Sequence, residues 1–389
     1  MNRIDGEVFK VVKEKEDKVI MSDSEINAKY KKGDSRIVTE QARFRIKDIK
    51  NMLNGDDYKL NPEYQRRQRW NDGKKSRLIE SFIMNVPLPP IFLYEYDFSK
   101  YEVMDGLQRI SAIDDFYNDR FELKELEYWR ELEGKVYSKL PSEIQKGIDR
   151  RFLSAIILLE ETANTPKEAE ELKQIVFERL NSGGEKLIAQ ETRNALYPGK
   201  FNELCIELAK NEKFKQMLRI PLAHDELIKN ISYKKMEDVE LVLRFFAYRF
   251  LDEFKMTKEK FLNEYLKQAN DFSEETISNL KKLFIETIDI VWEIFGKDAF
   301  LLPKNERTNK KPTTVIYDPL MQTIAKYMNQ KNTLLENKND IKNLKSNDIH
   351  NAFAKNGKLL FDGKYDHKAI VEQRVDYFDK LIKNILQNK

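Results

Sequence analysis

The stretch EVMDGLQRISAIDDFY (residues 102–117) changes its hydrophobic pattern halfway along. Its first residues predict a short strand that ends at Asp105. Gly106 permits a turn that a side chain would obstruct, and we expect a helix from about Leu107. Apolar residues then recur at helical spacing, at Ile110, Ile113 and Phe116. The stretch therefore predicts a strand, a glycine turn and an amphipathic helix, which is the local pattern of an α/β or α+β domain.

The polar residues at this joint are suited to binding an anion. A helix N-terminus offers N–H groups without intrahelical partners and a partial positive charge. Arg109 adds a planar guanidinium suited to bidentate phosphate contact, and Gln108 can donate or accept hydrogen bonds. Asp105 could hold a metal ion or orient a water molecule. The stretch alone leaves a second interpretation open, in which Asp105 caps the helix and Arg109 lies at the surface.

Composition excludes several classes of protein. The chain has 389 residues with 41% apolar content, enough for two or three domains. Its 69 basic and 66 acidic residues nearly cancel to +3, so any contact with DNA would have to be local. The lone cysteine, Cys205, excludes an intrachain disulfide and a cysteine-rich zinc site. The histidines are too scattered to suggest a metal centre; they are His224, His350 and His367. Because neither a signal core nor an apolar run near ~18 residues occurs, we expect a cytoplasmic protein without a membrane span.

The local pattern of charged and apolar residues divides the chain into three parts. Residues 1–35 carry charge runs without periodicity, which predicts a mobile lead-in or an arm that orders on a partner. Residues 36–165 mix strand and helix patterns, whereas residues 166–389 predict helix after helix, closing with a helix at about 368–386. Residues 331–345, rich in Asn and Lys, are expected to be a solvated surface segment. The fold class is therefore α+β, with a small N-terminal domain followed by a mostly α-helical one.

Two further motifs could contact an anion. NPEYQRRQRW (residues 61–70) interleaves basic, amide and aromatic side chains, and its arginines cannot all be buried without partners. Nucleotide phosphates, a nucleic-acid backbone or solvent would all satisfy them. In FERLNSGGEKL (residues 177–187) a helix ends in Asn181-Ser182-Gly183-Gly184, which fits a left-handed cap. The same N–H groups could receive a phosphate, although Walker A spacing is absent. Downstream, the next helix carries polar residues: Glu191, Arg193 and Asn194.

The order of four motifs resembles a known family. YQRRQRW, LIESFIMNVPLPPIFLYE, YEVMDGLQRISAIDDF and FERLNSGGEKLIAQETRNALYPGKF, within about residues 44–201, are similar to the N-terminal domain of GmrSD-type modification-dependent restriction enzymes. This domain also occurs in SspE-like proteins. The resemblance implies a small mixed-sheet, ParB/sulfiredoxin-like nucleotide-binding fold with Mg²⁺-dependent NTPase activity, used in defence against phage or foreign DNA.

The resemblance also implies roles for single residues. The nucleotide site would comprise Gln65, Arg66, Arg69, Gly106, Gln108, Arg109, Asn181, Gly183 and Gly184. Asp105 and Arg109 would be catalytic, with Asp105 the candidate Mg²⁺ ligand. One departure is visible, because Leu107 stands where the family usually has a glutamine. If that glutamine touches the ligand, nucleotide preference or hydrolysis differs here; if it points into the core, the change is harmless.

These observations favour an NTP-hydrolysing sensor or regulatory protein of a bacterial restriction or anti-phage system. The alternatives are a DNA-binding protein or nuclease that uses the same basic motif, and a nucleotide switch that does not hydrolyse. A self-contained nuclease is disfavoured because neither a Pro-Asp…Glu-x-Lys arrangement nor an HNH-type set of histidines is present. The expected partners are a nucleotide, modified or phage DNA and a separate nuclease subunit; a homo-oligomer is compatible with the sequence, and a membrane partner is not expected.

Overall fold

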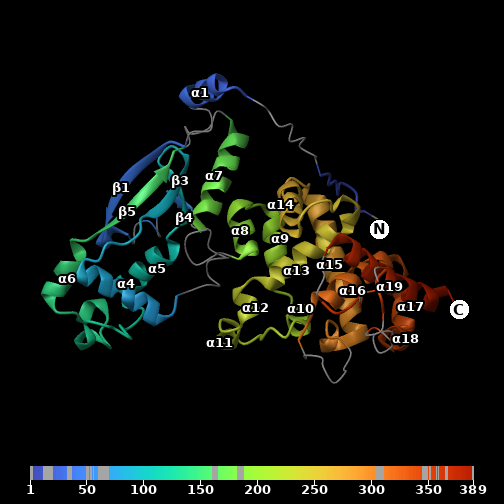
Figure 1. Cartoon of the computed structure of the whole chain (residues 1–389). Helices are drawn as coiled ribbons and strands as arrows, with labels where there is room; N and C mark the ends of the chain where they lie inside the picture. The colour runs from blue at the N-terminus through green and yellow to red at the C-terminus, as the bar shows by residue number, and fades with distance from the viewer. Residues whose placement is uncertain are drawn as a thin grey trace. The chain divides into compact units, whose positions relative to one another are not determined.

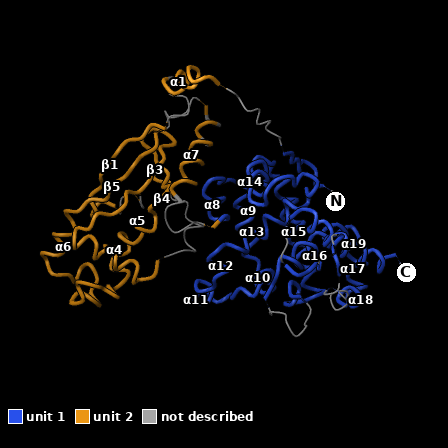
Figure 2. Tube along the Cα trace, in the orientation of Figure 1, with its two compact units in different colours: residues 1–14, 189–389 blue, residues 15–188 orange. Residues whose placement is uncertain are grey.

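A computed structural model describes most of the chain and divides it into two compact units. The described residues are 3–11, 21–32, 37–49, 52, 55, 57–59, 70–159, 165–181, 188–302, 311–343, 349, 352–355, 357, 359–363 and 367–387. One unit comprises residues 15–188, and the other comprises residues 1–14 together with 189–389 (Figure 2). We call them the sheet unit and the helical unit. The sheet unit is therefore inserted into the sequence of the helical unit.

The sheet unit is built on a mixed five-stranded sheet, in the order β1-β5-β3-β4-β2 (Figure 1). The strands are β1 (Thr39–Arg45), β2 (Tyr58–Lys59), β3 (Ile91–Asp97), β4 (Lys100–Asp105) and β5 (Phe152–Leu158). β1 and β5 are antiparallel, as are β3 and β4, whereas β3 is parallel to β5 and β2 is parallel to β4. The predicted small mixed sheet followed by a mostly helical region is confirmed.

The helices of the sheet unit are α1 (Asp23–Lys32), α4 (Asp72–Met84), α5 (Leu107–Tyr117), α6 (Ser142–Asp149) and α7 (Pro166–Asn181), with 3-10 turns η1 (Ile46–Asp48), η2 (Arg130–Leu132) and η3 (Tyr137–Lys139). Asn71 caps α4, because its side chain accepts a 2.9 Å hydrogen bond from the Lys74 N–H. Apolar residues of α4, α5 and one sheet face form a single core, including Ile79, Leu93, Val103, Ile110, Ile113, Phe116 and Ile157.

A buried carboxylate holds the long segment between α5 and α6. Glu80 accepts backbone N–H bonds from Glu127 at 3.1 Å, Tyr128 at 2.7 Å and Trp129 at 2.9 Å. Burial alone would raise the pKa of Glu80, but the three N–H donors and Arg77 outweigh it, and the pKa lies below its usual value.

We predict that Glu80→Gln destabilises the sheet unit by about 1–3 kcal/mol at neutral pH, because the amide accepts these bonds more weakly. The folded pKa is depressed, so the stabilisation is complete above the unfolded value near 4.5 and is lost as the pH falls through the folded value. Urea unfolding at a series of pH values should show the two proteins converging in acid. Glu143→Gln, whose carboxylate is 81% exposed, should remain close to wild type, and a pH-independent gap for Glu80→Gln would contradict the expectation.

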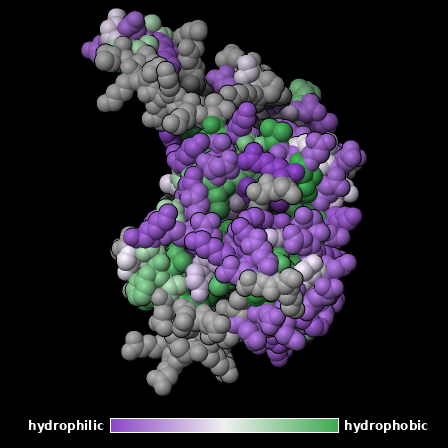
Figure 3. All heavy atoms as spheres, turned by 90° about the vertical axis from the view of Figure 1, so that its right-hand side faces the viewer, coloured by the Kyte–Doolittle hydropathy of each residue, from purple (hydrophilic) through white to green (hydrophobic). Residues whose placement is uncertain are grey.

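The helical unit packs its elements around an aromatic-rich core. They are α8 (Ala189–Leu196), α9 (Lys200–Leu208), α10 (Glu212–Met217), α11 (His224–Leu227), α12 (Ile231–Lys234), α13 (Glu237–Ala247), η5 (Tyr248–Glu253), α14 (Lys258–Ala269), α15 (Glu274–Phe295), η6 (Gly296–Asp298), α16 (Thr314–Lys326), η7 (Met328–Gln330), α17 (Lys331–Glu336), α18 (Lys338–Asn343) and α19 (Lys368–Gln387). The predicted closing helix corresponds to α19. The face of this unit in Figure 3 is mostly hydrophilic, with apolar side chains in scattered groups. None of the described helices is long and apolar enough to cross a membrane.

The solvated surface segment predicted at residues 331–345 is mostly exposed in its described part, but it is helical and anchored by buried side chains. Residues 331–343 form α17 and α18, and both helices contact α15. Leu334 and Ile341 are fully buried. Each of these short helices buries one aliphatic side chain, and both helices contact α15. One apolar residue per helix is too few to produce a hydrophobic periodicity that predicts a helix.

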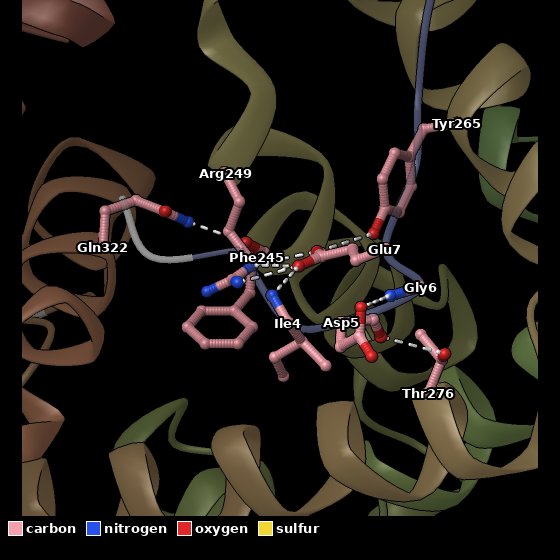
Figure 4. A network of polar contacts seen from close by, with 9 residues as sticks. All are labelled: Ile4, Asp5, Gly6, Glu7, Phe245, Arg249, Tyr265, Thr276 and Gln322. Atoms are coloured by element: carbon pink, nitrogen blue, oxygen red, sulfur yellow. Dashed lines mark hydrogen bonds and ion pairs between the residues drawn. The ribbon is translucent and has the colours of Figure 1, made fainter.

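The beginning of the chain is an integral part of the helical unit. Glu7 lies in its interior, where its carboxylate accepts bonds from Arg249 Nη2 at 2.8 Å and Nε at 2.9 Å (Figure 4). The Tyr265 hydroxyl lies 3.5 Å from the same carboxylate, and the Phe9 ring packs edge-on against Phe250 at 5.6 Å between centroids. Within the expected lead-in of residues 1–35, the first residues thus order on the chain's own helical unit.

Candidate functional site

The joint between β4 and α5 has the predicted form. β4 ends at Asp105, and Gly106 adopts a left-handed conformation with φ +100° before α5 begins at Leu107. A Cβ atom at Gly106 would lie 2.8 Å from Ile91 Cβ, closer than packed atoms tolerate. Glycine is therefore required here both for the backbone angle and for the space.

Arg109 is held in place at this joint rather than free at the surface. Its Nη2 donates a 2.7 Å hydrogen bond to Asp105 Oδ2, and its Nη1 donates to the Pro89 carbonyl oxygen. The Arg109 side chain is 12% exposed and that of Asp105 46%. Burial lowers the pKa of Arg109, and Asp105 partly offsets this effect. The alternative of an Asp105 cap and a surface Arg109 does not hold, since Gly106 is the N-cap and no side chain caps the helix.

Leu107 occupies an apolar position of the first helical turn. It is 9% exposed and belongs to the core of the sheet unit with Ile91 and Ile110. The residue at which the sequence departs from the GmrSD-type pattern thus packs into the core.

Gln108 connects the joint to the arginine-rich motif. Its Oε1 accepts a 3.3 Å hydrogen bond from the backbone N–H of Trp70, the last residue of NPEYQRRQRW. Gln65, Arg66 and Arg69 lie outside the described residues.

The strand that precedes the same motif in the sequence lies beside β4. β2 runs parallel to β4, with Lys59 opposite Glu102, so both strands end at the same edge of the sheet. The chain leaves β2 at Lys59 and returns at Trp70. The described residues on either side, Lys59 and Trp70, therefore both lie beside β4 or the joint.

Sequence reasoning missed a buried ion pair next to the joint. Lys173 Nζ on α7 lies 2.6 Å from Glu102 Oε2 on β4, with side chains 9% and 15% exposed. Lys173 Nζ also lies 5.3 Å from the Tyr94 ring centroid. The available signal was a lysine on the apolar face of a helix, beside Leu172 and four residues before Phe177, both buried. The pair docks α7 on the sheet.

α7 ends at Asn181, where the Asn-Ser-Gly-Gly motif begins. The side chain of Asn181, together with Gly183 and Gly184, lies outside the described residues. Their predicted contact with a nucleotide stays a prediction.

The polar residues of α8 lie in the interior of the helical unit. Arg193 is 1% exposed and donates to Asn263 Oδ1 and Glu240 Oε2, each at 2.9 Å, and to Gln190 Oε1 at 3.0 Å. Burial by itself would raise the pKa of Glu240, but the opposing effect of Arg193 and Lys258 is larger, so the pKa lies below its usual value. Arg193 thus ties α8 to α13 and α14.

Residues 49–198 match the family described as GmrSD restriction endonuclease, N-terminal domain. In this range the chain is similar to the GmrSD N-terminal domain. The matched GmrSD range includes the joint, the arginine-rich motif, α7 and α8, and it runs past the end of the sheet unit at Ile188. Comparison with curated proteins gives no match, and comparison with solved structures gives none.

Among the described residues, no three His, Cys, Asp or Glu side chains gather as a metal site. In the described part of the GmrSD domain, Asp105 has one oxygen engaged by Arg109. Mg²⁺ commonly takes one or two carboxylates and completes its shell with phosphate oxygens and water. The partly exposed Asp105 carboxylate, next to the N-terminus of α5, could supply one such ligand.

Proposed function

We propose that the GmrSD N-terminal domain of this chain binds a nucleoside triphosphate at the β4–α5 joint and hydrolyses it with Mg²⁺. The observation that carries the proposal is the immobilised Arg109 guanidinium in the first turn of α5, beside a glycine N-cap and a partly exposed carboxylate. Phosphoryl transfer depends mainly on positioning and charge stabilisation, so such a small set of groups is chemically sufficient.

Each residue then has a role in this proposal. Arg109 binds phosphate oxygens, with the N-terminal N–H groups of α5 beside it. Asp105 keeps Arg109 oriented with one oxygen and holds Mg²⁺ or a water with the other. The metal, when bound, would neutralise phosphate charge. Arg66 and Arg69 supply further positive charge from the motif that Gln108 anchors through Trp70.

The core position of Leu107 supports retention of nucleotide binding. A side chain that packs with Ile91 and Ile110 occupies space away from a ligand at the helix N-terminus. Because Leu107 packs into the core, its replacement of the family's glutamine is expected to leave nucleotide preference and hydrolysis unchanged. The regulatory role is proposed from the family, whose members belong to restriction systems. In this role the helical unit senses modified DNA, a phage component or a separate nuclease subunit.

We predict that Arg109→Ala lowers phosphate release about 10²–10³-fold, because the variant loses the fixed cation at the transferring phosphate. The measurement is phosphate release from ATP, GTP, CTP and UTP with Mg²⁺, with and without DNA. Arg120→Ala is the matched control, since Arg120 also pairs with aspartates, Asp114 and Asp115, but lies beyond the other end of α5. The control should keep wild-type turnover.

Thermal unfolding with each nucleotide separates the alternatives. A nucleotide-induced rise in melting temperature without phosphate release would select the non-hydrolysing switch. If no nucleotide changed the melting temperature of the wild type and none were hydrolysed, nucleotide binding at the joint would be excluded. Circular dichroism of Arg109→Ala separates loss of chemistry from loss of fold.

A further inference from the structure

One side of β1 and the adjoining end of β5 place two arginines around an exposed aromatic ring. The antiparallel register pairs Arg45 with Phe152 and Arg43 with Ser154, so these side chains share one sheet face. The guanidinium carbon of Arg43 lies 4.8 Å from the Phe152 ring centroid, and that of Arg45 lies 6.0 Å away. Phe152 is 42% exposed. The ring therefore holds both cations at the surface by cation–π contact.

Acidic side chains do not neutralise these cations within the described part of the chain. The ion pairs formed by the described residues involve neither Arg43 nor Arg45. The one acid on β1, Glu40, lies on the same face as Ala42 and Phe44, which is opposite to the face of Arg43 and Arg45. The other exposed residues of β1 and β5 on the arginine face are neutral; they are Thr39, Gln41 and Ser154.

This end of the sheet face is open to solvent, whereas α7 covers the neighbouring part. Lys173 of α7 contacts Glu102 and lies near Tyr94, which pairs with Leu158 at the far end of β5. Figure 1 shows α7 beside β3 and β4 and away from β1. We define the exposed strip as Gln41, Arg43, Arg45, Phe152 and Ser154.

We propose that this strip binds single-stranded nucleic acid through its phosphate backbone, without sequence preference. Arg43 and Arg45 are two residues apart on one strand, about 7 Å along it, so each can contact a different phosphate. Arginine forms bidentate bonds with phosphate, and an exposed aromatic ring on a flat sheet can stack on an unpaired base. Because the whole chain carries only +3, such binding depends on local charge of this kind.

A row of paired residues leads across the sheet from the strip to Asp105, the last residue of β4. Gln41 pairs with Ile156, Ile156 with Phe92, and Phe92 with Asp105. Three strand spacings separate the ends of this row, which is about 14 Å. The nucleic-acid proposal itself does not require nucleotide binding.

The test is fluorescence anisotropy of a labelled single strand of about 16 nucleotides over a salt series, without nucleotide. Each phosphate contact contributes about 0.7 to the slope of log K against log salt concentration for single strands. We expect Arg43→Ala/Arg45→Ala to reduce that slope by about 1.4 and to weaken binding at least about tenfold at low salt. Phe152→Ala should weaken binding about fivefold or more while keeping most of the slope.

The matched control is Arg120→Ala/Lys124→Ala, which removes the same charge from exposed residues of the sheet unit that pair with aspartates. It should keep the wild-type slope. The proposal is overturned if the full-length protein does not bind at low salt, or if the Arg43/Arg45 variant keeps its slope. An equal loss in the control, or stronger binding to the matching duplex or to anionic vesicles, would overturn it as well. Phosphate release is measured separately, so either proposal can fail without the other.

Discussion

Glu7→Gln should destabilise the helical unit by about 3–5 kcal/mol, because it leaves the Arg249 guanidinium buried without its counter-charge. The two side chains are 0% and 2% exposed, and the carboxylate accepts from both Nε and Nη2. Such a loss is a large part of the stability of an ordinary domain. Urea unfolding followed by helical circular dichroism measures it.

Arg3→Ala is the matched control for this prediction. Arg3 lies on the same N-terminal segment, but its ion pair with Asp252 is solvent-exposed, with side chains 47% and 63% accessible. We expect a change of about 0–1 kcal/mol. Glu7→Leu combined with Arg249→Met should recover much of the loss, because the pair is then replaced by apolar groups. If Glu7→Gln cost no more than the small effect expected for Arg3→Ala, the buried pair would not contribute to the stability of the helical unit.

Gly106→Ala should destabilise the sheet unit by roughly 2–6 kcal/mol and abolish the proposed activity at the joint. About 1–3 kcal/mol comes from placing a side chain at φ +100°, and a similar amount from the overlap with Ile91. The β4–α5 turn would have to shift, and Arg109 would lose its position relative to Asp105. Unfolding by urea and nucleotide-dependent thermal shift measure the two effects.

Gly134→Ala separates backbone strain from crowding. Gly134 also has positive φ, +75°, but a Cβ there would meet no atom within 4 Å. We expect a cost of about 1 kcal/mol and no effect on nucleotide binding. If Gly106→Ala cost no more than Gly134→Ala, the close contact with Ile91 would not limit the joint.

The local form of the joint was predictable because neighbouring residues decide it. The strand was expected to end at Asp105 and the helix to begin near Leu107, which is where β4 ends and α5 begins. Ile110, Ile113 and Phe116, expected on the buried face, are all fully buried. Hydrophobic period and glycine conformation are properties of a few consecutive residues, and they do not depend on the rest of the chain.

The partners of the polar and charged groups were not predictable in the same way. Lys173 pairs with Glu102 across 71 positions, Trp70 with Gln108 across 38, and Arg249 with Glu7 across 242. With charged residues forming 35% of the sequence, every lysine and arginine has many candidate partners. Burial selects among them, since a charge removed from water must meet an opposite charge or donor.

The sequence by itself determined the order of elements, the glycine joint and the motifs of the GmrSD N-terminal domain. The tertiary structure decided which groups contact one another. It fixed Arg109 between Asp105 and Pro89 and buried Leu107 in the core. It also left Arg43 and Arg45 exposed around Phe152. It also made the first residues part of a unit whose remaining sequence begins at Ala189. The physical reason is that propensity acts over a few residues, whereas desolvation acts on whatever the folded chain brings together.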